Sequence, residues 1–478
     1  MLAPQTVPAT ADELSSSRRR TLTWGTLIAV ALAVWGWRIG LRPLGDNSFL
    51  THLETGRRIL DHGIPRRDPY TFTAPGTPWV VQSWLASAWY GVLDRVGGWR
   101  ALQLFTGAVT LALSMIIWRL TVPARSVLAR AAIAALALAV ATGTWSERPL
   151  LLGLLFLGLS LLAVDGRLDA RWLIPIGWLW VNAHGSFPLG LLAVGVITLG
   201  RRLEGESIAN GLRALKLLAL GMVLGGINPL GPKLLTFPIH LLGRQAILNH
   251  ILEWQAPRFI IPGQRLFLLQ VAVAALLLAR RRNWVLGVSM AVFVPLALLS
   301  ARNINVASLV LLMAMAPSAR TERGLSGEQT ARAATLGTPI LLCFGLLMTL
   351  VSTTKPAVDL SGYPMKAVTW IDAHTDITAE RIATQDVIGN FLELVGNGHI
   401  PVFVDDRADM FPEAVFNDSI KLLDADRSWA EVLNRYHVTL VLWAATSPLA
   451  AVLEASPNWH VVYDDDDWIV AAPIDRTL

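Results

Sequence analysis

The chain is poor in cysteine and in charge. Its 478 residues include a single cysteine, Cys343, which lies inside an apolar run. One cysteine excludes a disulfide framework and a cysteine-based metal site. Charged residues make up 16% of the chain, the formal net charge is +5, and no basic stripe is interleaved with aromatic residues, so nucleic-acid binding is not expected. No His and Glu spacing matches an H-E-x-x-H motif, so the motifs indicate no metal site.

Long apolar segments take the place of charge. Hydrophobic residues make up 53% of the chain, and the mean hydropathy is +0.49. A soluble protein of this size could not bury so much apolar surface, so we expect an α-helical polytopic membrane protein with about eleven transmembrane helices. The candidate spans are 21–40, 99–120, 129–145, 149–165, 172–183, 186–200, 210–227, 265–279, 284–300, 303–317 and 335–353.

The positions of the arginines predict which side of the membrane each loop faces. Residues 1–20 are polar and end in three arginines, and no cleavage-site pattern follows, which indicates an uncleaved first helix with a cytoplasmic N-terminus. If 172–200 is broken near 182–188 into two helices, the later arginine clusters all face the cytoplasm, as the positive-inside rule requires. We therefore expect a membrane domain over 21–353, with an outer first loop at 41–98, and an extracytoplasmic domain over 354–478.

The first outer loop has the pattern of two amphipathic helices. Apolar residues recur on one face of 47–62, and Gly63 and Pro65 are typical of a helix end. A second helix is predicted over 82–96, and we expect both helices to lie at the membrane surface. Asp46 directly precedes the first helix. It is either an N-cap or a general base that takes a proton from an acceptor hydroxyl, and one residue can serve as both.

Further polar side chains are expected on the outer face. Ionisable groups at the ends of membrane helices are usually paired or functional, and arginine forks match phosphate oxygens. The arginines of the first loop either contact lipid headgroups or hold a phosphate leaving group, and His184 is either a structural histidine or part of the site. Together these residues predict an outer cavity for a substrate with a lipid tail and a phosphate head. The candidate substrate-binding residues outside the C-terminal domain are Arg57, Arg58, Arg66, Arg67, Arg148, Asn182, His184, Glu253 and Arg302.

Several short motifs resemble those of a known superfamily. They are Asp46, the run GRRILDHGIPRRDPYTFT at 56–73, the segment 79–84, RPLL from Arg148, WVNAHGSF at 180–187, and the pair Asn228 and Glu253. With this topology, the chain resembles the GT-C glycosyltransferases, in particular bacterial relatives of the protein O-mannosyltransferases and aminoarabinose transferases. The resemblance implies inverting transfer of a sugar from a polyprenyl-phosphate donor. It also implies that Asp46 is the base and Asp68 an assisting acid. Gln82 stands where many members have Glu or His.

Residues after about 355 show strand and helix patterns in alternation. Strands are predicted at 381–385, 401–406, 438–444, 460–465 and 468–473, with helices at 387–396, 428–437 and 448–455, which favours a small α/β domain with a largely parallel sheet. Asp406 and Arg407 follow a strand end, so they belong either to a solvated loop or to a substrate site. Asp464–Asp467 is most simply a hairpin turn, with a Ca²⁺ site as the alternative. No G-x-G-x-x-G or P-loop motif is present, so acceptor binding or support is expected here.

The expected function is sugar transfer from a polyprenyl-phosphate donor, at the cell membrane, to an extracytoplasmic glycan, lipid or protein. The alternatives are a translocator of lipid-linked sugars, an inactive GT-C-like scaffold, and a transferase that uses a phospholipid headgroup. No cofactor is required, and dependence on a divalent cation is left open. Polar residues concentrate at outer helix ends instead of in the middle of spans, which favours transfer over translocation.

Overall fold

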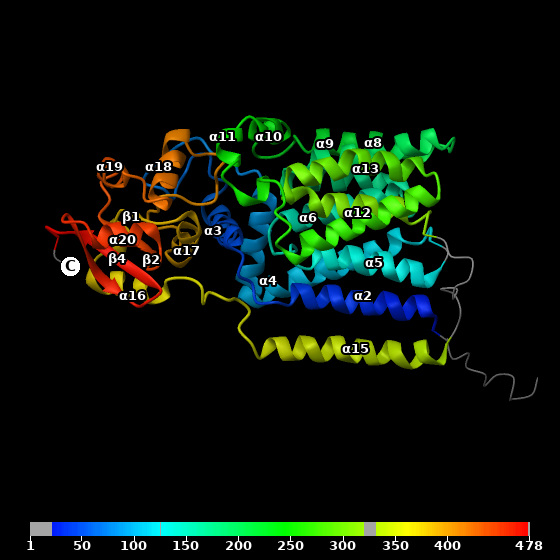
Figure 1. The fold of residues 1–478 in the computed structure, drawn as a ribbon, viewed down its shortest axis with the longest axis horizontal. Coiled ribbons are helices and arrows are strands. Elements are labelled where there is room, and N and C mark those ends of the chain that lie inside the picture. The colour runs from blue at the N-terminus through cyan, green and yellow to red at the C-terminus, as the bar shows by residue number, and fades with distance from the viewer. Residues whose placement is uncertain (1–21, 125, 320–330, 477–478) are drawn as a thin grey trace, which may run out of the picture.

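The computed structural model describes residues 22–124, 126–319 and 331–476. A bundle of roughly parallel helices occupies one half of the molecule and a small α/β domain occupies the other, with α3 (Asn47–His62) between them (Figure 1). Each of the eleven predicted spans is a helix. These helices are α2 (Trp24–Gly40), α4 (Trp84–Leu120), α5 (Val127–Ala141), α6 (Leu150–Val164), α7 (Leu173–Ala183), α8 (Phe187–Leu203), α9 (Ala209–Leu224), α12 (Pro262–Arg280), α13 (Trp284–Leu299), α14 (Ile304–Met315) and α15 (Arg332–Thr353).

Among the described helices, α4, α12 and α15 are long and apolar enough to cross a membrane by length and composition. Eleven crossings therefore stay a prediction. The predicted break between α7 and α8 is present at residues 184–186. The cytoplasmic tail predicted at 1–20, and most of the loop at 318–332, lie outside the described residues.

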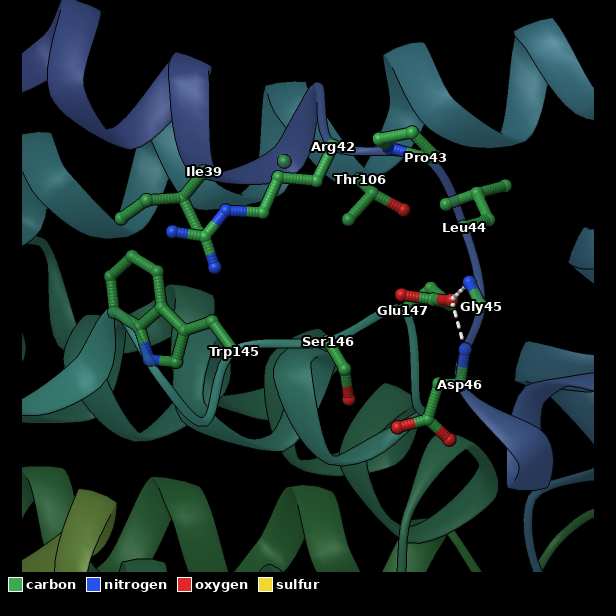
Figure 2. Close-up of a pocket in the computed structure, with 11 residues that line it drawn as sticks. Ile39, Arg42, Pro43, Leu44, Gly45, Asp46, Thr106, Trp145, Ser146 and Glu147 are labelled. Atoms are coloured by element: carbon green, nitrogen blue, oxygen red, sulfur yellow. Dashed lines mark hydrogen bonds between the residues drawn. The ribbon is translucent and has the colours of Figure 1, made fainter. Parts of the chain in front are cut away.

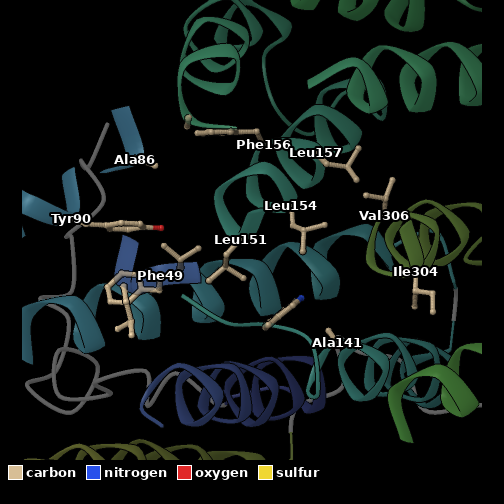
Figure 3. Packing of buried hydrophobic residues seen from close by; sticks show 14 of the residues in the cluster. Phe49, Ala86, Tyr90, Ala141, Leu151, Leu154, Phe156, Leu157, Ile304 and Val306 are labelled. Carbon is tan, nitrogen blue, oxygen red and sulfur yellow. The ribbon is translucent and has the colours of Figure 1, made fainter. Parts of the chain in front are cut away.

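The core of the bundle surrounds α6. Leu151, Leu154 and Leu157 of this helix are buried against Ile304 and Val306 of α14 (Figure 3). Small residues allow other helices to approach closely, as is common where apolar helices pack together. For example, a Cβ atom on Gly40 of α2 would lie 2.5 Å from the Cα atom of Gly107 in α4.

The first loop contains both predicted helices. The second is the N-terminal part of α4, which the non-helical backbone of Gly97 and Gly98 separates from the membrane segment. Gly98 has φ 57°, a conformation that glycine adopts at low cost. The prediction that the first helix lies on the membrane surface is corrected in one respect. The apolar face of α3, with Phe49 and Leu53 fully buried, packs against α4 and against α17 (Asp386–Val395), so protein covers it.

The connections between the membrane helices and the C-terminal domain contain the remaining elements. Short helical segments connect the membrane helices: η1 (Ala170–Trp172), α10 (Lys233–Leu242), α11 (Gln245–Leu248), η2 (Leu252–Trp254) and η3 (Ala301–Asn303). The C-terminal domain has α17 and, in addition, α16 (Met365–His374), η4 (Ile377–Ala379), α18 (Glu413–Leu423), α19 (Trp429–Arg435), α20 (Pro448–Glu454), β1 (Ile382–Ala383), β2 (Leu440–Ala444), β3 (Trp459–Asp464) and β4 (Trp468–Pro473).

The sheet is not largely parallel, as the alternation of strands and helices had suggested. Its order is β1-β2-β4-β3, and only β1 and β2 run parallel. The reason is the tight hairpin at Asp464–Asp467, which returns β4 antiparallel to β3 and places it beside β2. The hairpin prediction for this segment is therefore confirmed. The predicted strand at 401–406 forms only isolated bridges, through Val402.

The first loop joins the C-terminal domain through backbone hydrogen bonds. The amide of Phe72 donates to the carbonyl of Val402 (3.1 Å), and the amide of Val402 donates to the carbonyl of Tyr70 (3.0 Å). The segment after α15 also returns to the first loop, because the amide of Leu44 donates to Ala357 and the amide of Asp359 donates to Leu44. The residues around Asp46 are thus enclosed between the bundle and the C-terminal domain.

Candidate active site

Asp46 lies where α2, α3 and the turn between α5 and α6 meet. It is the N-cap of α3: its Oδ1 atom accepts a hydrogen bond from the amide of Ser48 (3.1 Å). The same oxygen accepts a hydrogen bond from Nε of Arg148 (2.6 Å). Aspartate caps helices well because its carboxylate satisfies free amides of the first turn. The N-cap prediction is therefore confirmed, and capping leaves the second carboxylate oxygen of Asp46 available for chemistry.

Glu147 is an acidic residue that contacts the backbone at Asp46. Its Oε1 atom accepts hydrogen bonds from the amides of Gly45 (2.8 Å) and Asp46 (2.9 Å) (Figure 2). The side chain is 8% exposed, and burial raises the pKa of Glu147. The sequence analysis did not select Glu147. The available signal was an acid directly before Arg148 in an outer turn.

Arg148 connects three elements of the site. It donates to Asp46, to the carboxylate of Glu253 in η2, and to Oδ1 of Asn47 (3.3 Å). Burial opposes its charge, but the attraction of Asp46 and Glu253 outweighs burial and raises the pKa of Arg148. The structure thus brings together two residues predicted to bind substrate and the predicted base.

Two cavities meet at Asp46. The first has a volume of about 250 Å³ and the second about 310 Å³, and Asp46, Trp145 and Ser146 line both. The second cavity has a polar end with Arg148, Glu253, Arg302 and Asn305. Its walls are apolar and include Leu150, Leu151, Leu154, Ile261 and Ile304. An apolar wall that leads to two guanidinium groups matches the shape of a lipid phosphate.

Arg302 lines the second cavity, and His184 lies next to Arg302. The guanidinium of Arg302 is 4.9 Å from the ring centroid of Trp254, and its Nη2 atom is 3.5 Å from Nε2 of His184. Nδ1 of His184 accepts a hydrogen bond from the amide of Ser186. This bond leaves the proton on Nε2, so the ring nitrogen that faces the arginine is not an acceptor for it.

The C-terminal domain contributes Asp406. Its backbone amide donates to Oδ1 of Asn390, which also accepts from the hydroxyl of Thr51 in α3 (2.8 Å). Burial raises the pKa of Asp406 to about 7, although a hydrogen bond with the Ser48 hydroxyl and the charge of Arg148 lower it. Asp406 therefore reaches the first turn of α3, beside Asp46, and changes its charge near neutral pH.

Asp68 and Arg407, which were predicted to act at the site, form a separate buried cluster. Nη2 of Arg407 donates to Asp68 (2.7 Å), and its Nε donates to Asp405 (2.9 Å). Asp68 also accepts hydrogen bonds from the amide and hydroxyl of Thr71. Neither residue lines the cavities beside Asp46. This cluster connects the first loop to the C-terminal domain. The assisting role of Asp68 and the substrate-binding role of Arg407 stay predictions.

The four first-loop arginines that were predicted to bind substrate also lie outside both cavities. Arg57 pairs with Asp94 (2.8 Å), Arg66 donates to the carbonyl of Pro229, and Arg67 donates to the carbonyl of Gly76. Arg58 follows Arg57 in α3 and lines neither cavity. Arg148 and Arg302, in contrast, line the second cavity.

Asn182 is a structural residue of the bundle. It is fully buried, accepts a hydrogen bond from Nε1 of Trp84 (2.9 Å) and donates to the carbonyls of Trp178 and Gly225. It lines neither cavity, and the substrate contact predicted for it stays a prediction. Within 22–124, 126–319 and 331–476, no group of three or more His, Cys, Asp or Glu residues could hold a metal ion.

No protein-family model matches the sequence, and no curated protein matches it. Two solved structures are similar over 95% of this chain. One is the archaeal oligosaccharyltransferase AglB from Archaeoglobus fulgidus in complex with an inhibitory peptide and a dolichol-phosphate (TM-score 0.51, 11% identity, 75% of that chain covered). The other is the arabinofuranosyltransferase AftD from Mycobacteria (TM-score 0.52, 14% identity). This chain has a GT-C-like fold.

The fold, and not the activity, is what these similarities show. The chain spans 40% of the length of AftD. The GT-C fold is a multi-pass membrane fold, which agrees with the apolar helices found here. The roles of Asp46 and its neighbours depend on the geometry described above.

Proposed function

We propose that this GT-C-like protein transfers a sugar from a polyprenyl-phosphate donor to an acceptor hydroxyl, with Asp46 as the general base. The observation that carries the proposal is the position of Asp46 between two cavities, one of which combines an apolar wall with Arg148 and Arg302. An apolar wall suits an isoprenoid chain, and two guanidinium groups suit its phosphate.

The reaction is an in-line displacement at the anomeric carbon of the donor. Asp46 takes the proton of the acceptor hydroxyl as its oxygen forms a bond to C1, and the bond from C1 to the phosphate oxygen breaks. The phosphate leaves with the electron pair, and Arg148 and Arg302 stabilise its charge. When no sugar donor is bound, Arg148 donates a hydrogen bond to Asp46. A phosphate that binds Arg148 competes for this contact, so donor binding frees the carboxylate.

The charge distribution supports an outward-facing site. Asp165 pairs with both Arg167 (2.8 Å) and Arg201 (2.6 Å), so two arginine-rich turns meet at one end of the bundle. The turn after Arg280 lies at the same end, which is opposite the C-terminal domain (Figure 1). Cytoplasmic loops carry the excess of arginine, which supports an extracytoplasmic location for Asp46 and the C-terminal domain. A lipid-phosphate donor fits this side because it needs no nucleotide.

The test is the variant Asp46→Asn. Asparagine caps helices as well as aspartate, so α3 is expected to stay intact while the base is lost. Sugar transfer from polyprenyl-phosphate donors in membranes should fall by about 10²- to 10⁴-fold. Asp61→Asn, at the exposed end of the same helix, is the matched control. Unchanged transfer by Asp46→Asn would remove Asp46 as the base. Absence of transfer by the wild-type protein with every donor, together with movement of the donor across vesicles, would favour the translocator.

A further inference from the structure

The first cavity lies on the other side of Asp46 from the proposed phosphate site, and nothing above assigns it a ligand. Its wall is formed by the end of α2, the following residues to Asp46, Thr106 of α4, and the turn 145–147 (Figure 2). Its volume of about 250 Å³ is below the roughly 300–1,000 Å³ typical of drug-sized ligands. The cavity is therefore large enough for one ring and too small for a chain of rings.

Glu147 supplies a free acceptor at one end of this cavity. Its Oε1 atom holds the amides of Gly45 and Asp46, and Figure 2 shows the second oxygen directed into the cavity. Among the described residues, no other side chain is recorded as a hydrogen-bond donor to that second oxygen. A carboxylate oxygen that faces a cavity can accept a hydrogen bond from a ligand hydroxyl.

Arg42 supplies a positive charge at the other end. Its Nη1 atom donates to the carbonyl of Thr142 (3.1 Å), and its guanidinium extends into the cavity above Trp145 (Figure 2). Among the described residues, no acidic side chain pairs with Arg42. The cavity therefore presents an acceptor and a cationic donor at opposite ends (Figure 2).

We propose that this cavity binds the reacting ring of the acceptor, and that the ring is a sugar that carries an anionic substituent. This inference rests on the proposed function, since an in-line displacement places the acceptor on the side of C1 opposite the phosphate. Glu147 accepts a hydrogen bond from a ring hydroxyl, and Arg42 binds the carboxylate or phosphate of the ring. Glu147 thus positions the ring so that a neighbouring hydroxyl faces Asp46.

The first experiment measures binding without turnover. Purified protein is titrated with methyl glucuronide and with the neutral methyl glucoside, and the tryptophan fluorescence is followed because Trp145 lines the cavity. The variants are Arg42→Gln and Glu147→Gln. Glutamine at 147 can still accept both backbone amides through its oxygen, so the loop is expected to keep its shape. Arg66→Gln, an arginine outside both cavities, is the control.

The wild-type protein should bind the glucuronide more tightly than the glucoside. Arg42→Gln should weaken glucuronide binding about 10- to 100-fold and leave the glucoside unchanged, as expected for the loss of a charged hydrogen bond. Glu147→Gln should weaken both glycosides. Equal affinity for the two glycosides, or no effect of Arg42→Gln, would overturn the proposal, and so would the absence of binding by the wild type.

A second measurement separates this inference from the proposed function. Asp46→Asn is titrated with the same two glycosides and is also assayed for sugar transfer. If that variant still transfers sugar but Arg42→Gln weakens binding of the glucuronide and not of the glucoside, the base assignment fails and the cavity assignment stands. If Asp46→Asn is inactive and Arg42→Gln binds both glycosides as the wild type does, the function stands and the cavity assignment fails. In transfer assays, Arg42→Gln should raise KM for an anionic acceptor with kcat and the donor KM unchanged.

Discussion

Replacement of Arg407 by methionine should separate the first loop from the C-terminal domain. The guanidinium is 6% exposed, pairs with Asp68 and Asp405, and lies over the rings of Trp79 (4.4 Å) and Tyr70 (4.8 Å). Methionine has a similar length and fills the space above the rings. The substitution therefore removes the charge and little of the packing, and leaves the buried side chains of Asp68, Asp405 and Glu393 without a cation.

The magnitude follows from burial. Loss of one partner from a buried ion pair costs about 3–5 kcal/mol, whereas an exposed pair contributes about 0–1 kcal/mol. The amides of Phe72 and Val402 bond across the same contact, so their hydrogen exchange reports its local opening. Since 1.36 kcal/mol is a factor of ten, their protection should fall by about 10²- to 10³·⁵-fold. The control is Arg95→Met, which removes a pair whose two side chains are about half exposed.

One result would refute this reasoning. If Arg407→Met kept wild-type protection at Phe72 and Val402, Arg407 would not be what connects the two parts. If the same variant also raised the KM for the donor, the residue would bind substrate, as its position after a strand end had suggested. The expected result is lost protection, with any loss of transfer restored at lower temperature.

Three further variants test other contacts. Gly56→Ala should lower stability by about 1–3 kcal/mol in thermal unfolding, because a Cβ atom there would lie 1.9 Å from the carbonyl oxygen of Ser87, whereas Gly195→Ala has open space and should not. The folded-state pKa of Asp406 is raised from 3.8 to about 7, so its ionisation makes unfolding easier as pH rises through this window. Asp406→Asn should therefore flatten the fall in stability between about pH 4 and 7, and an unchanged slope would contradict this. Arg302→Gln should raise the donor KM about 10-fold or more and leave the acceptor KM unchanged in steady-state transfer kinetics.

Local signals in the sequence predicted the elements around the site well. The start of α3 depends on Asp46 as N-cap, and its end depends on Gly63, whose φ is 81°. Both are properties of single residues and their immediate neighbours, so no tertiary information is needed. The break between α7 and α8 required the distribution of arginines over the whole chain, which is also visible in the sequence.

The partners of charged residues could not be predicted in the same way. Asp68 and Arg407 are 339 residues apart in sequence, and each has a plausible role when considered alone. Only the docking of the C-terminal domain on the first loop makes them partners. The same holds for Glu147, which belongs to the site because α2 ends where its carboxylate can accept the amides of Gly45 and Asp46. The direction of β4 was missed because periodicity reports a strand and not its neighbour.

The position of α3 explains why the C-terminal domain bears on the chemistry. Asp46 caps the N-terminus of this helix, Thr51 in its middle bonds to Asn390 of α17, and Gly56 further along lies against Gly91 of α4. A helix is stiff over this length, so a shift of the C-terminal domain at Thr51 moves Asp46 relative to Arg148, which belongs to the bundle. The distance between Asp46 and Arg148 is therefore set by two contacts of one helix, one on each part of the molecule. In the proposed reaction, the C-terminal domain would act without a catalytic group of its own, through the placement of α3.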